Sequence, residues 1–206
     1  METEVREPAV AYGKQKFSIE EYLEMEKDST FKHEYYNGEI FLMAGTKADH
    51  NTITINLIVI MRHQLKGGPC RVFSSDMRVN VDENDLYTYP DLSIVCGQPT
   101  FRDNDQFNLK NPSVIIEVLS RSTKEYDRGD KFKLYQELRS LKEYILVDSQ
   151  SVLVEHFIKN EQGEWIRSQY SQLSDTFIVE AADVALSVKE IYEDTQFPKL
   201  THNSRF

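Results

Sequence analysis

The sequence predicts a mixed α/β fold in which helices flank one central β-sheet. Apolar residues recur at helical spacing in some segments, runs rich in branched and aromatic residues fill others, and Pro and Gly mark the borders. With 206 residues, 40% of them hydrophobic, the chain suits one domain and is too short for two large ones. We expect that domain at 17–195, between polar, non-periodic and therefore flexible segments at 1–16 and 196–206.

The first predicted elements are a helix, a hairpin and a longer helix. Ser18 and Glu21 have capping-box spacing and begin a helix over 18–28. Asn37-Gly38, a strong hairpin signal, lies between two strand-like runs in the segment 33–44. Apolar positions at helical spacing predict the second helix over 50–66, which the Gly67-Gly68 pair ends.

Strands dominate the rest of the chain. A third helix is predicted over 122–139, with Ser122 and Glu125 as its capping box, and a short helix over 187–193. Apolar and β-branched runs predict strands at 70–81, 89–97, 112–120, 143–149, 151–159 and 164–171.

The charge and the apolar runs of the chain argue against some classes of protein. The formal net charge of −10 argues against a general nucleic-acid binder, whose affinity comes from clustered Lys and Arg. The segment 121–142 differs, with seven basic residues against four acidic ones, and is the expected docking surface for a phosphate-bearing substrate. No apolar run approaches the ~20 residues of a membrane span and the N-terminus is polar, so we expect a cytoplasmic protein without membrane contact.

The two cysteines are expected to be inert. Cys70 and Cys96 are too few for a disulfide framework or a CxxC metal site. Each lies in a strand-like apolar run, where a small buried thiol is the ordinary interpretation.

A carboxylate interrupts the most apolar strand. Glu117 lies within IIEVLS, where an ionised group costs several kcal/mol unless a partner compensates it. If the strands at 89–97 and 112–120 pair as an antiparallel hairpin whose turn is centred on residue 104, Asp91 faces Glu117. Residue 104 lies in RDND, the most turn-like stretch of the connecting loop, which favours this register.

Facing carboxylates at about 5 Å repel, so one must hold a proton or both must share a cation. Mg²⁺ or Mn²⁺ would remove the conflict. The plainer alternatives are a strand-edge Asp91 and a Glu117 that is answered by an Arg or Lys from a neighbouring element.

Four motifs in order carry a family resemblance: YPDLSIV, VIIEVLSRST, DRGDKFKLY and KEYILVD. The chain from about 17 to 188 resembles the Uma family of restriction-endonuclease-fold proteins, within the PD-(D/E)xK nuclease superfamily. The resemblance implies an αβββαβ core, metal-dependent phosphodiester hydrolysis, a nucleic-acid substrate with DNA favoured, and a homodimer. It also implies Asp91 and Glu117 as metal ligands.

The lysine of the PD-(D/E)xK motif is expected at a different position in this chain. Leu119 stands where the superfamily has lysine, and the resemblance implies that Lys131, on the next helix, replaces it. Asp127, Lys131 and Tyr135 lie at i, i+4 and i+8 on one helical stripe, although an Asp–Lys pair at this spacing is also a common surface salt bridge. We expect Tyr135 to pack or hydrogen-bond behind the site.

Three further residues are candidates for supporting roles. The resemblance offers Glu34 as a third acid near the metal. His50 begins a helix, where it could touch an anion or act as a base, and Ser120 could donate to phosphate or, more simply, cap a helix. Leu119 and the net charge favour the alternative of a weak or inactive nuclease-fold protein that serves as a binding or assembly module.

Overall fold

The computed structural model describes residues 16–196. The two segments predicted to be flexible lie outside the described residues, apart from Lys16 and Gln196. The helices are α1 Ile19–Asp28, α2 Ala48–Gln64, α3 Lys124–Arg128, α4 Asp130–Tyr135 and α5 Val188–Ile191, with short 3₁₀ turns at Asp82–Asn84 and Arg102–Asn104.

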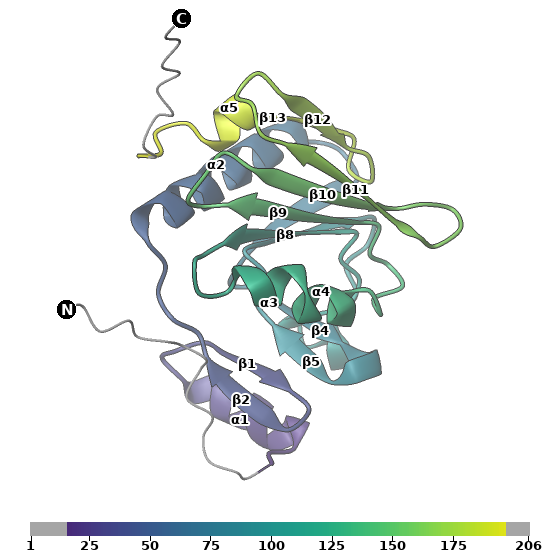
Figure 1. Ribbon diagram of the computed structural model, residues 1–206. Coiled ribbons are helices and arrows are strands. Elements are labelled where there is room, and N and C mark those ends of the chain that lie inside the picture. Colours follow the sequence, from purple (N-terminus) through teal and green to yellow (C-terminus); the bar gives the residue numbers. More distant parts are fainter. Residues whose placement is uncertain (1–15, 197–206) are drawn as a thin grey trace, which may run out of the picture.

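A six-stranded sheet forms the centre of the molecule (Figure 1). Its strands, in spatial order, are β11 Trp165–Tyr170, β10 Val154–Lys159, β9 Glu143–Asp148, β8 Val114–Leu119, β6 Leu92–Cys96 and β3 Cys70–Ser74. β8 and β9 are parallel and the other neighbours are antiparallel. Along the chain, α2, β3, β6, β8, α3–α4 and β9 give the αβββαβ order, so the mixed α/β class is confirmed.

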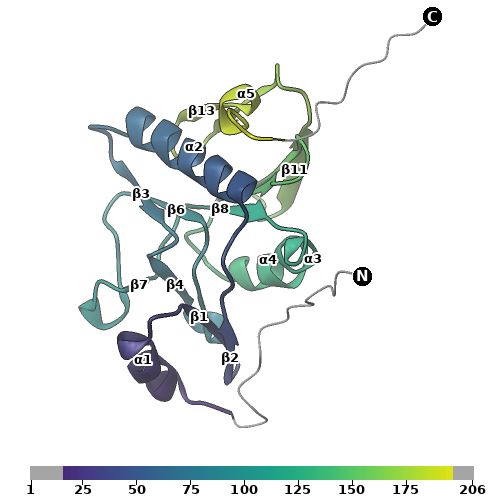
Figure 2. The same ribbon diagram turned by 90° about the vertical axis from the view of Figure 1, so that its left-hand side faces the viewer.

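A smaller five-stranded sheet lies beside the central one, toward α1 (Figure 2). Its strands, in spatial order, are β2 Glu39–Leu42, β1 His33–Tyr36, β5 Leu86–Thr88, β4 Arg78–Val81 and β7 Asn108–Leu109. A two-stranded ribbon of β12 Thr176–Val179 and β13 Val184–Ser187 completes the strands of the described region.

Two apolar layers sandwich the central sheet. On one face α2 buries Ile53, Leu57 and Met61 against alternate residues of β6, β8 and β9. On the other face α4 buries Phe132 and Tyr135 against the remaining residues of β8 and β9. Because β8 is covered on both faces, all six of its residues are buried, which explains its nearly continuous apolar sequence.

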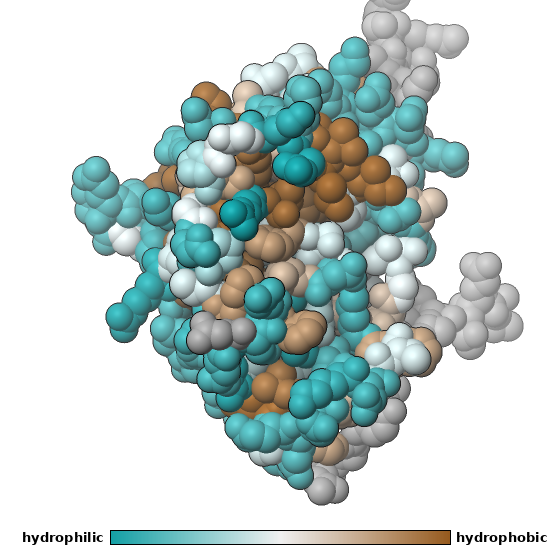
Figure 3. Space-filling model, turned by 180° about the vertical axis from the view of Figure 1, so that it is seen from behind, coloured by the Kyte–Doolittle hydropathy of each residue, from teal (hydrophilic) through white to brown (hydrophobic). Residues whose placement is uncertain are grey.

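Two large apolar side chains lie on the exposed side of α2. Ile55 and Val59 are 50% and 60% exposed. Figure 3 shows apolar surface gathered on the upper part of the back face, the side on which β3 lies in Figure 2.

The N-terminal predictions are confirmed. Ser18 and Glu21 form the capping box of α1. β1 and β2 pair as the predicted hairpin, and Asn37 and Gly38 both have positive φ, as a two-residue turn of this kind requires. α2 matches the predicted second helix to within two residues at each end.

Two predicted elements were wrong in detail. The expected strand at 70–81 is two strands, β3 and β4, which belong to different sheets. The expected helix over 122–139 is two short helices that break at Gly129, where a Cβ would lie 3.0 Å from the Glu125 carbonyl oxygen. Its capping box does not form, because Thr123 is the N-cap and makes no side-chain cap.

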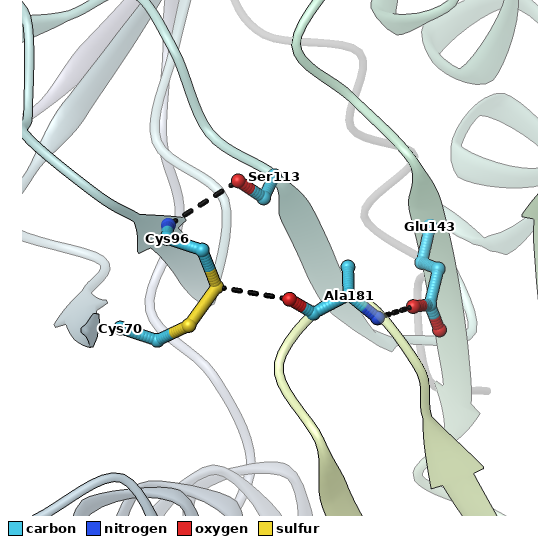
Figure 4. Close-up of a disulfide and its surroundings, with 5 residues drawn as sticks. All are labelled: Cys70, Cys96, Ser113, Glu143 and Ala181. Carbon is cyan, nitrogen blue, oxygen red and sulfur yellow. Dashed lines mark hydrogen bonds between the residues drawn. A yellow bond between two sulfur atoms is a disulfide. The ribbon is translucent and has the colours of Figure 1, made fainter. Parts of the chain in front are cut away.

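The prediction of two inert thiols was also wrong, since Cys70 and Cys96 form a disulfide (Figure 4). The antiparallel register of β3 and β6 places the two residues directly opposite each other. Cys96 Sγ lies 3.1 Å from the carbonyl oxygen of Ala181, in the loop between β12 and β13. The disulfide therefore fastens the edge strand β3 to the sheet, next to the point where the β12–β13 ribbon contacts it.

Candidate active site

Asp91 and Glu117 meet at one end of the β6–β8 pair. Leu92 lies opposite Ile116 and Ser93 opposite Ile115, the predicted register, so Asp91 and Glu117 form the next pair outward. The backbone N–H of Asp91 donates to Glu117 Oε2 at 3.3 Å. In return, the N–H of Val118 donates to Asp91 Oδ2 at 2.8 Å. Each carboxylate is thus fixed by the backbone of the other's strand.

Lys131 enters the same space from α4. Its Nζ lies 3.0 Å from Glu117 Oε1 and 3.7 Å from Asp127 Oδ1. The break at Gly129 leaves Asp127 and Lys131 on the same side, so the structure brings together the predicted stripe even though the helix is not continuous. Lys131 is 5% exposed, which shows that the pair with Asp127 is not a surface salt bridge.

Glu34 reaches the cluster from the other sheet. It lies on β1, and its Oε1 is 3.1 Å from Lys131 Nζ. The hydroxyl of Thr88, at the end of β5, donates to the same oxygen. Lys131 is therefore shared by one carboxylate from the central sheet and one from the smaller sheet.

Tyrosines support the buried carboxylates from behind. The hydroxyl of Tyr135, a fully buried side chain, donates to Glu117 Oε1 at 2.9 Å. The Tyr144 hydroxyl donates to the backbone carbonyl of Asp127 at 3.0 Å and so fixes the end of α3. Sequence reasoning missed both Tyr144 and Thr88. The polar Thr88, two residues before Pro90, was a signal, but its three-residue strand was not recognised.

The remaining two candidates differ in position. His50, in the first turn of α2, is buried, and its Nε2 lies 3.3 Å from Asp91 Oδ2. Ser120 instead accepts the N–H of Thr123 at 3.2 Å and contacts the hydroxyls of Ser122 and Thr123. It orders the turn before α3, and its hydrogen bonds stay within that turn.

Burial controls the electrostatics of the cluster. Desolvation raises the pKa of Glu117 to about 8, although the charge of Lys131 opposes the change. Desolvation likewise raises the pKa of Asp127. Burial by itself would lower the pKa of Lys131, but Glu117, Glu34 and Asp127 surround it and raise its pKa well above the usual value. Lys131 is therefore a permanent cation among carboxylates that compete for it.

The donor set suits a hard divalent ion. No three or more His, Cys, Asp or Glu side chains within residues 16–196 form a preformed metal centre. Asp91 and Glu117 nevertheless offer two adjacent carboxylates, and Mg²⁺ typically takes one or two of these and fills its other positions with water and substrate phosphate. The carboxylates of Glu34, Glu117 and Asp127 all lie within 4 Å of Lys131 and outnumber it, so an additional positive charge is electrostatically favourable.

The basic segment 121–142 does not form one free cationic face. Lys131 lies inside the site, Arg128 pairs with Glu155 at 2.5 Å, and Lys133 pairs with Asp130 at 2.8 Å. Local acidic residues thus neutralise part of the predicted docking surface.

Within the described part of the chain, no helix combines the length and apolar character needed to cross a membrane.

A family model described as "Uma2: Putative restriction endonuclease" matches residues 19–189.

Similar proteins come from cyanobacteria. The chain is 37% identical to "Uncharacterized protein slr1290" of Synechocystis sp. over 88% of its own length and 94% of that protein. It is 38% identical to "Uncharacterized protein sll1609" of the same organism, over 72% of this chain and 84% of that one. A crystal structure of "a putative nuclease belonging to DUF820" from Anabaena variabilis aligns with a TM-score of 0.67 at 18% identity, over 84% of this chain and 96% of that one, which establishes the shared restriction-endonuclease-like fold.

Proposed function

The chain belongs to the Uma2 family of restriction-endonuclease-like proteins, and from this premise we propose that it is a metal-dependent nuclease that hydrolyses phosphodiester bonds, with DNA favoured. One observation carries the proposal: Lys131 Nζ lies 3.0 Å from Glu117, while Asp91 faces Glu117 across the strand pair. Two adjacent acids and one buried lysine are the groups that phosphodiester hydrolysis needs.

The residues divide the chemistry among them. Asp91 and Glu117 would hold Mg²⁺ or Mn²⁺, which when bound makes the attacking water more acidic and polarises the phosphate. Lys131 offsets the negative charge that builds on the phosphate oxygens during attack. Glu34 and Asp127 keep Lys131 charged and in place. In the net reaction the water oxygen bonds to phosphorus, the bond from phosphorus to the departing nucleotide oxygen breaks, and that oxygen gains the proton.

His50 and Tyr135 act as positioning residues in this proposal. His50 contacts Asp91 Oδ2 and Tyr135 contacts Glu117 Oε1, so each restrains one of the two metal-holding carboxylates. Outer contacts of this kind usually change metal affinity or activity by about 10- to 100-fold when removed.

A binding or assembly module without catalysis is the second candidate, favoured by Leu119 at the motif position. The site argues for the enzyme, because Lys131 brings an ammonium group to Glu117 from a different element. The homodimer and the cytoplasmic location stay predictions from the sequence.

The test is cleavage of labelled DNA and RNA, single-stranded and duplex, with Mg²⁺ or Mn²⁺ and with EDTA, by the wild type and Glu117→Gln. Metal binding is measured on the same samples by calorimetric titration. Metal-dependent cleavage that disappears in the variant supports a nuclease. Metal binding without cleavage of any substrate would instead support the module.

A further inference from the structure

The central sheet has an open edge at β3. Within the described residues, β3 is the last strand on its side of the sheet, and Figure 2 shows it outermost, beside α2. Successive residue pairs of an antiparallel ladder alternate in the direction of their backbone groups. The carbonyl of Ile94, opposite Val72, accepts the N–H of Ser113 on the β8 side, so the N–H and C=O of Val72 point away from β6. Val72 therefore directs a backbone donor and acceptor to the open edge.

A hollow of about 280 Å³ lies against this edge. It is lined by residues 70–73 of β3, by Arg62 in the last turn of α2 and by Leu65 just after that turn. Ile55 and Val59 are exposed and lie on the same helical stripe as Arg62, at spacings of four and three residues. An extended peptide can add a strand at such an edge, where backbone hydrogen bonds give affinity and side-chain contacts give specificity.

The charge of this surface is opposite to that of the whole chain. The chain has 34 acidic residues and a formal net charge of −10, but no Asp or Glu lies between residues 50 and 75. That stretch includes most of α2 and all of β3, and it carries the exposed cations Arg62, Lys66 and Arg71. Within residues 16–196 these three form no ion pair, whereas Arg128 and Lys133 are paired with acids. The edge therefore combines uncompensated positive charge with apolar contacts.

The features of this surface favour one kind of partner over two others. A second copy, paired antiparallel through β3, would place Arg71 diagonally across from its own symmetry mate, and each copy would bring a net charge of −10. A nucleic acid would leave the apolar stripe and the backbone of Val72 unused, and its binding usually rests on about 6–10 phosphate contacts. An extended peptide with acidic and apolar side chains uses the backbone edge, the stripe and the cations together.

We propose that β3 and α2 form a docking site for an extended acidic peptide of a partner protein, which joins the central sheet as a strand beside β3. The peptide backbone pairs with Val72, and its carboxylates pair with Arg62 and Arg71. Its apolar side chains contact Ile55 and Val59. The arginine on the open edge also gives selectivity, because it discourages pairing with strands that bring no negative charge.

This docking site is separate from the candidate active site. His50, which contacts Asp91, lies in the first turn of α2, whereas Arg62 lies in its last turn. At 1.5 Å per residue the two are about 18 Å apart along the helix. The proposal therefore goes beyond the nuclease function and does not depend on it.

Synthetic peptides test the proposal on the full chain. Labelled nine-residue peptides in which Val, Ile or Phe alternates with Glu are compared, by fluorescence anisotropy, with the same peptides carrying Lys in place of Glu. We expect Glu peptides to bind at least about tenfold more tightly than their Lys counterparts. Arg62→Glu and Arg71→Glu should each weaken this binding by at least about tenfold, because a carboxylate replaces a cation at an exposed position that no ion pair stabilises.

Arg139→Glu is the matched control. Arg139 is exposed and follows α4, which covers the face of the central sheet opposite α2. Charge reversal there changes the net charge by the same amount as Arg71→Glu, and the Glu peptides should bind this variant like the wild type.

Amide hydrogen exchange shows whether the peptide binds as a strand. With a Glu peptide at saturation, exchange of the Val72 amide should slow by at least about tenfold, because its N–H gains an acceptor. The amide of Arg71, the next residue along the strand, points toward β6 and should exchange as in the free protein.

Several outcomes would overturn the proposal. They are equal binding of Glu and Lys peptides, no binding of either, equal binding by Arg71→Glu and Arg139→Glu, and an unchanged exchange rate of Val72 in the complex. A dimer in sedimentation that protects the Val72 amide without peptide would assign the surface to a second copy. Binding of a 15-nucleotide DNA that Arg71→Glu abolishes, without peptide binding, would assign it to nucleic acid. None of these results depends on metal binding by Asp91 and Glu117.

Discussion

Asp91 and Glu117 hold each other through the backbone: the N–H of Asp91 donates to Glu117 at 3.3 Å, and the N–H of Val118 donates to Asp91 at 2.8 Å. This reciprocal arrangement keeps two carboxylates side by side although their charges repel. It also determines which substitutions can test the site, because removal of either side chain leaves a backbone donor without its acceptor.

Asp91→Asn should remove metal binding while the fold is kept. The amide oxygen can still accept the N–H of Val118, but the negative charge that a divalent ion requires is lost. We expect Mg²⁺ and Mn²⁺ affinity to fall by at least about 100-fold in calorimetric titration. Asp76→Asn, at an exposed residue that pairs with Lys32, is the control and should bind metal like the wild type. Unchanged metal affinity in Asp91→Asn would exclude Asp91 as a ligand.

Lys131→Met should destabilise the metal-free protein strongly. It leaves Glu117, Glu34 and Asp127 without their shared cation, and breaking a buried pair costs about 3–5 kcal/mol. Urea unfolding at pH 8 in EDTA measures the loss, and added Mg²⁺ should restore more stability to this variant than to the wild type. Lys133→Met removes an exposed pair on the same helix and should change stability by less than about 0.5 kcal/mol.

The stability of the metal-free protein should fall as pH rises from 5 to 9. Burial raises the pKa of Glu117 to about 8, so the folded state holds this proton more tightly than the unfolded chain does. The resulting stabilisation is complete below about pH 4.3 and is lost as the pH rises through about 8. The glutamine side chain in Glu117→Gln cannot ionise, so this variant does not lose stability through ionisation at residue 117.

Urea unfolding in EDTA measures this effect across the pH range. The free energy of unfolding of Glu117→Gln should increase relative to that of the wild type as the pH rises, by up to about 5 kcal/mol at pH 9. Glu137 is exposed, so Glu137→Gln serves as the control, and its free energy of unfolding should change with pH as that of the wild type does. A constant difference between wild type and Glu117→Gln at all pH values would show that Glu117 is ionised throughout.

Loss of the Cys70–Cys96 disulfide should lower stability without affecting the site. The bond closes a loop with a sequence separation of 26 residues, for which chain entropy predicts about 3.5 kcal/mol. Urea unfolding of the wild type with and without reductant measures this value, and the double variant Cys70→Ala, Cys96→Ala should not respond to reductant. Mg²⁺ affinity should stay the same, because Asp91 directly precedes β6 whereas Cys96 is its last residue. Equal stability of the oxidised and reduced wild type would contradict the prediction.

The central part of the fold was predictable because its signals are local. The turn-like RDND segment predicted the midpoint of the β6–β8 pair, and the antiparallel register then placed Asp91 opposite Glu117. The capping box of α1 and the Asn37-Gly38 turn depend on residues close together in the chain and were equally readable.

Non-local pairings were not predictable from the sequence. Cys70 meets Cys96 only because β3 pairs with β6 while β4 and β5 leave for another sheet. Thr88 meets Glu34 because the three-residue strand β5 lies beside β1, and so short a run has no periodicity to detect. The break at Gly129 depends on a close approach to the Glu125 carbonyl, which a helical pattern does not reveal.

The distance along the chain between Glu34 and Lys131 has a consequence for biosynthesis. The two residues are 97 positions apart, and both must be present before the carboxylates of the two sheets can share the lysine. A chain still emerging from the ribosome, with β1, β6 and β8 already made but α4 not yet released, therefore holds acids without their ammonium group. For the proposed nuclease, the cluster that would carry the chemistry is therefore incomplete until α4 has been released.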